Sequence, residues 1–325
     1  MLEDLIDSIR AAVRANDRAT GDDTLTIEPV LNWGGFVNRS FRIDDGRRRF
    51  LKLANDAVIS RGLEKWRELA DLLAARYHAP RMLDWLDIPG TPFAGPLFEW
   101  IEGRTPTTLN AGLAARISAV IRTLHDDLEL AARLGPASSL GRAYLHAYDD
   151  RFSEDLAFIA LDPPPFITPD LLAWMQNEAS SLAAQVQRSA AFDELARSPV
   201  HNDLWVNNIL VDPGGQWFLL DWDGLALGDP LIDWVMLFGP TRNAPFAATE
   251  ATIRNHVPLN AAGNERLAVY LQASQLDWVI DPLADWVQAA HEPEHGAQVR
   301  AANETVYNAS RRAYLSRFSS RPSTD

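Results

Sequence analysis

The sequence predicts an α+β fold of two lobes: an N-terminal lobe with a small antiparallel sheet at residues 1–100, and a mostly helical lobe at residues 101–325. Residues 24–53 place short apolar runs between turn residues, which is typical of three short strands. A chain of 325 residues also exceeds one ordinary domain. Beyond residue 107 the apolar side chains recur at helical spacing, as in Leu109, Leu113, Ile117, Ile121 and Leu124.

The N-terminal lobe begins with the amphipathic segment MLEDLIDSIRAAVRAN, which predicts a packed helix rather than a secretory signal. Its apolar residues line one stripe: Leu2, Leu5, Ile6, Ile9 and Val13. The strands that follow are expected to turn at Gly34-Gly35 and at residues 44–46. Because the Gly34-Gly35 pair has no Cβ atoms, its backbone N–H groups are able to approach an anion closely.

Lys52 lies in the third predicted strand between Leu51 and Leu53, so its side chain points to the opposite face of the sheet from theirs. A helix is predicted at residues 61–77, followed by strands near residues 82–85 and 96–101. In the second lobe, Asp229-Pro230 predicts a helix start, because aspartate caps free N–H groups and proline suits the first turn.

The strongest functional pattern is the stretch at residues 199–223, PVHNDLWVNNILVDPGGQWFLLDWD. It holds His201, Asp203, Asn208 and Asp221 around two short apolar segments, and it predicts loop, strand, turn and strand in that order. Magnesium-assisted phosphoryl transfer needs this set of groups. One carboxylate lies near the acceptor hydroxyl, while an amide and a second carboxylate hold the metal on the nucleotide phosphates.

On these motifs the chain resembles the aminoglycoside phosphotransferase and choline kinase family, which shares the protein-kinase-like fold. The resemblance covers most of residues 24–240. The HxDxxxxN run with its following DWD, the glycine hairpin, the lysine strand and the segment LFEWIEG at 97–103 come in the family's order. The resemblance implies a two-lobed protein-kinase-like fold and the cofactors ATP and Mg²⁺.

The resemblance also implies a role for each matching residue. Asp203 would be the catalytic base or would orient the acceptor hydroxyl, and His201 would buttress its loop. Asn208 and Asp221 would bind the metal ion. Lys52 would contact the α- and β-phosphates of the nucleotide.

In the hinge, Phe98 would occupy the gatekeeper position. The backbone carbonyl of Glu99 and the amide of Ile101 would meet the adenine edge. The family pattern also pairs the strand lysine with a glutamate of the following helix. Glu64 and Glu68 lie one turn apart on one face of that helix, and the spacing favours Glu68 while leaving Glu64 open.

Two departures from the family pattern bear on the acceptor. Asn202 stands where glycine is common, and the segment LWVN at 204–207 replaces a stretch that often reads LHPG. Both alter the wall that faces the acceptor, so the acceptor is not carried over from the family. The GDP-x-x-D segment with Asp229 and Asp233 would brace the site, and His125 is expected to be a structural hydrogen-bonding group.

Two further patterns are interpreted as structural. Asp277, Asp281 and Asp285 recur one helical turn apart beside two tryptophans, which favours a solvated helix face, with an ammonium-binding site as the alternative. The segment HEPEH at 291–295 matches the zinc-protease pattern, but Pro293 breaks the helix that such a site requires. We therefore expect a polar loop there.

Composition limits the partners. The formal charge of −14 argues against nucleic acid and favours a cationic acceptor. The sequence has no apolar run of about 18 residues, so no membrane partner is expected. It has no cysteine, which excludes disulfides and thiolate metal sites. A cytoplasmic location is expected, because ATP is found there.

The sequence therefore predicts an ATP- and magnesium-dependent phosphotransferase that moves the γ-phosphoryl group to a hydroxyl of a small molecule. Choline, sugar or fructosamine-type acceptors remain alternatives to an aminoglycoside. A nucleotide-binding pseudokinase scaffold is an alternative of another class, against which the retained Lys52, Asp203, Asn208 and Asp221 argue. The short connection after Asp221 disfavours a protein substrate.

Overall fold

The computed structural model describes residues 2–16, 25–30, 38–54, 57–239, 249–257, 259–291 and 295–318. Its elements follow one another along the chain as α1 (Leu2–Asn16), β1 (Thr26–Pro29), β2 (Asn38–Asp44), β3 (Arg48–Ala54), α2 (Ala57–Tyr77), β4 (Met82–Asp87), β5 (Ala94–Glu99), α3 (Ala111–His125), α4 (Leu128–Arg133), α5 (Leu140–Tyr144), η1 (Leu145–Asp149), α6 (Asp150–Leu161), α7 (Pro169–Arg188), η2 (Ala190–Phe192), β6 (Ser198–Val200), η3 (Val206–Asn208), β7 (Ile209–Val211), β8 (Trp217–Leu219), η4 (Trp222–Gly224), β9 (Ala226–Gly228), α8 (Pro230–Leu237), α9 (Thr249–His256), α10 (Ala261–Gln288), η6 (Ala289–His291) and α11 (Gly296–Phe318).

The chain divides into two compact units. Unit 1 comprises residues Met1–Ile121 and Val206–Leu225, and unit 2 comprises residues Arg122–Trp205 and Ala226–Asp325. The stretch at 199–223 is therefore shared between them: its first part packs within unit 2, and its β-hairpin packs within unit 1. The lobe boundary at residue 100 stays a prediction.

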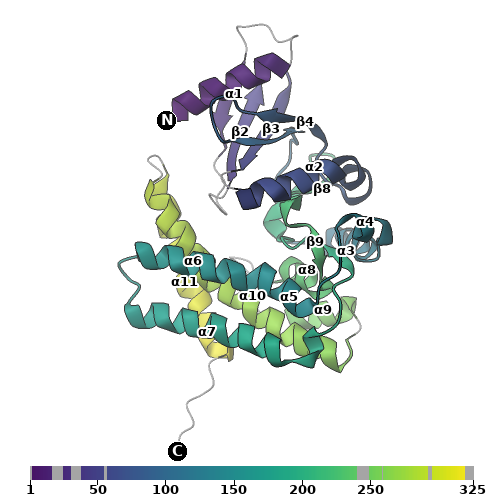
Figure 1. Cartoon of the computed structure of the whole chain (residues 1–325), viewed down its shortest axis with the longest axis vertical. Helices are drawn as coiled ribbons and strands as arrows, with labels where there is room; N and C mark the ends of the chain where they lie inside the picture. Colours follow the sequence, from purple (N-terminus) through teal and green to yellow (C-terminus); the bar gives the residue numbers. More distant parts are fainter. Residues whose placement is uncertain are drawn as a thin grey trace, which may run out of the picture. The chain divides into compact units, whose positions relative to one another are not determined.

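Unit 1 is built on an antiparallel five-stranded sheet in the order β1-β2-β3-β5-β4. The three strands predicted within residues 24–53 are present, and the turn before β3 has Gly46 at a φ of 95°, in the left-handed region that glycine favours. Helix α1 packs the middle of its apolar stripe against one face of this sheet, where Leu51 and Leu53 are fully buried (Figure 1). Leu2, at the end of the stripe, is exposed.

Lys52 lies on the other face of the sheet, as the alternation of β3 predicted, and α2 covers that face. Strand β5 runs very close to β3 at this point. A Cβ atom placed on Gly95 would lie 1.9 Å from the carbonyl oxygen of Lys52. Glycine at position 95 therefore allows the backbone of β5 to lie against the backbone of β3 at Lys52.

Unit 2 is mostly helical, and the 28-residue helix α10 is its central element. Helices α6, α7, α8 and α11 all pack against α10, and Figure 1 shows several of them running alongside it. The helix continues through Pro282. Because neighbours cover α10 on several sides, Asp277 and Asp285 are each only 5% exposed. The prediction of a solvated carboxylate face was wrong for these two residues.

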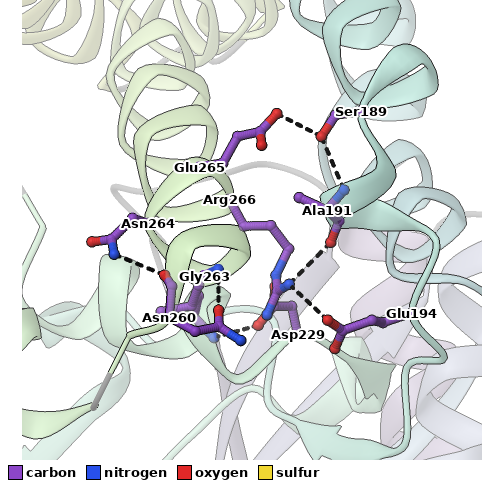
Figure 2. A network of polar contacts seen from close by, with 10 residues as sticks. Ser189, Ala191, Glu194, Asp229, Asn260, Gly263, Asn264, Glu265 and Arg266 are labelled. Carbon is purple, nitrogen blue, oxygen red and sulfur yellow. Dashed lines mark hydrogen bonds and ion pairs between the residues drawn. The ribbon is translucent and has the colours of Figure 1, made fainter.

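The predicted helix start at Asp229-Pro230 is confirmed, and it belongs to a wider polar network (Figure 2). One carboxylate oxygen of Asp229 accepts the Leu231 N–H at 3.1 Å, and the other accepts Arg266 Nε–H at 2.7 Å. Arg266 also donates to the carbonyl oxygen of Ala191 at 3.0 Å and lies 3.7 Å from a carboxylate oxygen of Glu194. The arginine thus ties α10 to the start of α8 and to the segment before β6.

Some predicted features lie outside the described residues. Gly34 and Gly35 are among them, as are residues 292–294 of the HEPEH segment. Within the described part of the chain, the search for a helix of membrane-spanning length and apolarity finds none.

Candidate active site

The loop that carries Asp203 is held by His201 and Asp233 in unit 2. His201 is fully buried, and its Nδ1 accepts the backbone N–H of Asp203 at 3.2 Å. A nitrogen that accepts a hydrogen bond carries no proton, so His201 is held as the neutral tautomer with its proton on Nε2. This contact fits the buttressing role expected of His201.

Asp233, on α8, gathers three donors around one buried carboxylate. It accepts the backbone N–H groups of His201 at 2.9 Å and of Asn202 at 3.0 Å. It also accepts a hydrogen bond from Nε2 of His125 at 2.9 Å. These hydrogen bonds fit the structural roles predicted for Asp233 and His125, because a fully buried carboxylate requires such donors, and here they hold the loop that carries Asp203.

Asn202 explains one departure from the family pattern. Its φ is 66°, in the left-handed region where a side chain is usually disfavoured. Glycine adopts this region freely, and asparagine is among the few other residues that visit it routinely. The loop therefore keeps its shape without glycine.

The two expected metal ligands lie at one end of the β7–β8 hairpin in unit 1. The strands pair Ile209 with Leu219, and the N–H of Leu220 donates to the carbonyl oxygen of Asn208 at 2.8 Å. This bond places Asn208 beside the residue that precedes Asp221. Asp221 itself has a φ of 60°, so the chain turns sharply there.

Asn208 and Asp221 form a donor set that suits magnesium. Amide and carboxylate oxygens are hard ligands, and Mg²⁺ is commonly bound through one or two carboxylates together with substrate phosphates. The described residues contain no group of three or more His, Cys, Asp or Glu side chains arranged to hold a metal ion.

Lys52 is 5% exposed and contacts two carboxylates of unit 1. Its Nζ lies 2.5 Å from Oδ1 of Asp221 and 3.1 Å from Oδ2 of Asp223. Burial disfavours the charged ammonium, but the two carboxylates outweigh this effect and raise the pKa of Lys52 above its ordinary value. The two carboxylates thus favour the charged form of the lysine, and its contact with phosphate stays a prediction.

The predicted ion pair between Lys52 and a glutamate of α2 is not present. Glu64 and Glu68 are both exposed on the helix surface, and the ion pairs of Lys52 are with Asp221 and Asp223. We had not singled out Asp223. Its signal in the sequence was the second aspartate of DWD, two residues after the expected metal ligand.

The hinge residues Phe98 and Glu99 are the last two residues of β5, and Ile101 lies just beyond it. Phe98 is 2% exposed, and its ring centroid lies 4.5 Å from that of Trp66 on α2. The backbone N–H of Glu99 donates to the carbonyl oxygen of Arg81 at 3.0 Å, and the Glu99 carboxylate accepts the Arg81 N–H at 3.0 Å. Ile101 is half-buried just beyond the strand. The contacts that Glu99 and Ile101 would make with adenine stay predictions.

A cluster of carboxylates with a single arginine lies between α6 and α10 in unit 2. Arg151 forms an ion pair with Asp277. Burial raises the pKa of Asp155 to about 6, with the neighbouring Asp277 adding to the effect and Arg151 opposing it. Burial and then Asp285 and Asp277 raise the pKa of Asp281 well above its ordinary value. The cluster thus contains more carboxyl groups than its one ion-paired arginine can balance, and burial favours the protonated form of Asp281.

A tryptophan next to this acidic cluster on α10 contacts the loop that carries Asp203, within unit 2. Trp278 follows Asp277 on α10, and its ring meets the ring of Trp205 edge-on, with centroids 5.6 Å apart. Trp205 lies two residues after Asp203. Helical periodicity predicted the stripe of aspartates on α10. No sequence pattern indicated that Asp155 and Arg151 of α6 would lie beside it.

Comparison with known proteins relates the chain to phosphotransferases. A model of the phosphotransferase enzyme family matches residues 29–270. No match was found among curated proteins.

Among solved structures, an aminoglycoside phosphotransferase in complex with GDP and kanamycin is 11% identical, with a TM-score of 0.62 over 95% of this chain and 99% of that chain. One from Streptomyces rimosus, in complex with ADP and streptomycin, is 22% identical, with a TM-score of 0.51 over 84% and 98%. An ethanolamine kinase from Plasmodium vivax is 13% identical, with a TM-score of 0.57 over 89% and 82%. This likeness confirms the predicted kinase-like α+β fold.

Proposed function

Because the chain belongs to the phosphotransferase enzyme family, as its motifs predicted, we propose that it transfers the γ-phosphoryl group of ATP to a hydroxyl group of a cationic small molecule. The observation that carries this proposal is the contact of buried Lys52 with Asp221 at the end of the β7–β8 hairpin. A buried, charged lysine beside a magnesium-type ligand is the arrangement that nucleotide phosphates require. The protein would act in the cytoplasm, where ATP is available.

The residues divide the chemistry between them. Lys52 binds phosphate oxygens, and Asn208 and Asp221 hold the metal ion. Magnesium bound there supplies charge neutralisation for the phosphates. Asp203 accepts the proton of the acceptor hydroxyl or orients it, while Asp233 and His201 keep its loop in place. Since the transition state of phosphoryl transfer is loose, catalysis rests on positioning and electrostatics.

The acidic cluster supports a cationic acceptor. Arg151 forms an ion pair with Asp277, and two further carboxyl groups, those of Asp155 and Asp281, lie near the same arginine. Such a group attracts an ammonium ion, and the neighbouring Trp278 offers a ring for a cation–π contact. Two of the similar structures hold kanamycin and streptomycin, a third is an ethanolamine kinase, and all three of these compounds are amines.

The proposal is tested by an acceptor screen with the purified chain. ADP release is measured with ATP and Mg²⁺ over aminoglycosides, choline, ethanolamine, glycated amines and neutral sugars, and GTP replaces ATP in a second series. We expect acceptor-dependent release with an amino alcohol. If the chain binds nucleotide but no acceptor raises ADP release, the pseudokinase alternative is correct.

The variant Asp203→Asn serves as the control for the chemistry. It should lower kcat by about 10² or more, which is the contribution expected of a general base. Affinity for the nucleotide should stay the same, because Asp203 is assigned to the acceptor. Near-normal turnover in this variant would sink the assignment of Asp203.

A further inference from the structure

The geometry points to Asp223, rather than a glutamate of α2, as the carboxylate that positions Lys52 for the nucleotide. This inference rests on the proposed phosphotransferase function, and it assigns Asp223 as a positioning residue. Oδ2 of Asp223 lies 3.1 Å from Nζ of Lys52, and the two side chains are 21% and 6% exposed. Glu64 and Glu68 are exposed on α2.

Two carboxylates share this lysine, and one of them, Asp221, is also the expected metal ligand. Asp221 is the expected metal ligand, so its oxygens are needed by magnesium when the nucleotide binds. A buried ammonium group that loses its counter-charge is strongly destabilised. Asp223 would then be the carboxylate that keeps Lys52 directed when Asp221 holds a metal ion.

Helix α2 fixes Asp223 through its backbone. A Cβ atom placed on Gly62 would lie 2.6 Å from the carbonyl oxygen of Asp223, so the helix touches the η4 turn directly. Nζ of Lys65, one turn further along α2, donates to the carbonyl oxygen of Leu225 at 2.9 Å. These contacts hold the turn at Asp223 and at the residue two positions after it.

The turn is also anchored from within. Trp222 is fully buried, and its indole N–H donates to the carbonyl oxygen of Leu219 at 2.8 Å. The backbone on either side of Asp223 is therefore held by β8 and by α2. Helix α2 thus supports the η4 turn by direct contact. The turn, through Asp223, supplies the carboxylate for Lys52 that a glutamate of α2 was expected to provide.

A double-mutant cycle on the ligand-free full chain tests the pair without any catalysis. Urea unfolding is measured for Lys52→Met, Asp223→Asn and the double variant, and then for Lys52→Met combined with Glu64→Gln or Glu68→Gln. We expect the Lys52 and Asp223 changes to be non-additive and both glutamate changes to be additive. Additive losses for Lys52 and Asp223 overturn the inference, and so does coupling to either glutamate.

Should Asp223→Asn fail to fold, the inference requires that the added Lys52→Met change restore folding, because it removes the ammonium group that has lost a partner. A double variant that stays unfolded overturns it.

A kinetic arm separates positioning from a purely structural role. Asp223→Asn should lower kcat/KM for the nucleotide about tenfold or more, because a misplaced Lys52 stabilises the transition state less well. The KM for the acceptor should not change, and Asp223→Glu should restore most of the loss. Glu64→Gln and Glu68→Gln should behave like the unaltered chain. Equal losses in Asp223→Asn and Asp223→Glu contradict the inference.

The two arms also separate this inference from the proposed function. An inactive protein in which Lys52 and Asp223 are coupled contradicts the phosphotransferase activity alone. An active enzyme in which they are additive contradicts the assignment of Asp223 alone.

Discussion

The carboxylate of Asp221 contacts Lys52 in the structure, and the proposed function requires it to bind a metal ion as well. We expect Asp221→Ala to abolish the tightening of ADP binding by Mg²⁺, because the main charged ligand is lost. Titration calorimetry with and without Mg²⁺ measures this directly. Asp223→Asn is the matched control and should retain the magnesium effect. A persisting effect in Asp221→Ala would show that this carboxylate is not a metal ligand.

At the residue scale, the sequence predicted groups whose spacing reflects the chemistry itself. His201, Asp203, Asn208 and Asp221 were predicted in this way, and the structure places the first pair in one loop and the second pair at one end of the β7–β8 hairpin, while their chemical roles stay predictions. The partner of Lys52 was missed, because helical spacing tells which residues share a face but not which neighbour that face meets.

The burial of Asp277 and Asp285 could not be predicted for the same reason. The spacing of Asp277 and Asp285 gave a stripe on α10, yet only the packing of other helices makes these residues 5% exposed. Tertiary contacts of this kind leave no local pattern in the sequence.

At the scale of elements, the contact of α2 with η4 depends on a single missing side chain. We expect Gly62→Ala to destabilise the protein by about 1–3 kcal/mol, because its Cβ would press on the carbonyl oxygen of Asp223. The variant should also weaken nucleotide binding, since the turn holds Asp223. Urea unfolding and calorimetry measure the two effects.

Gly112→Ala on α3 is the matched control. Its added Cβ would lie 3.5 Å from the nearest atom, an ordinary contact, so stability should be unchanged or raised by up to about 1 kcal/mol. If Gly62→Ala is as stable as Gly112→Ala, the helix does not clamp the turn as described.

The predicted elements exist, but several of their ends differ. Helix α2 begins at Ala57 rather than at residue 61, and β5 covers Ala94–Glu99 rather than 96–101. Strand pairing decides where β5 begins and ends, because β5 pairs with both β3 and β4. Gly95 belongs to the strand, where it lies close to the backbone of Lys52. Local turn signals give the order of elements, whereas pairing partners set their limits.

At the scale of the whole molecule, stability should depend on pH in an unusual direction. The pKa of Asp155 is raised to about 6, so the folded protein binds a proton in a range where the unfolded chain has released it. Asp155 should therefore contribute added stability as the pH is lowered from about 7.5 towards about 5.5. Thermal unfolding across this range measures the change.

The variant Asp155→Asn isolates the group responsible. It cannot ionise, so the part of the gain that comes from Asp155 should disappear, and the melting temperature should be flatter over the same pH range. Identical pH profiles for the two proteins would exclude Asp155 as the source.

The left-handed backbone at Asn202 also limits how the gene can change at this position. The codons of glycine, aspartate and asparagine are connected by single-base changes, as in GGC, GAC and AAC. All three residues tolerate a positive φ. The glycine common in the family and the asparagine of this chain are therefore joined by a mutational route on which every intermediate keeps the shape of the loop that presents Asp203.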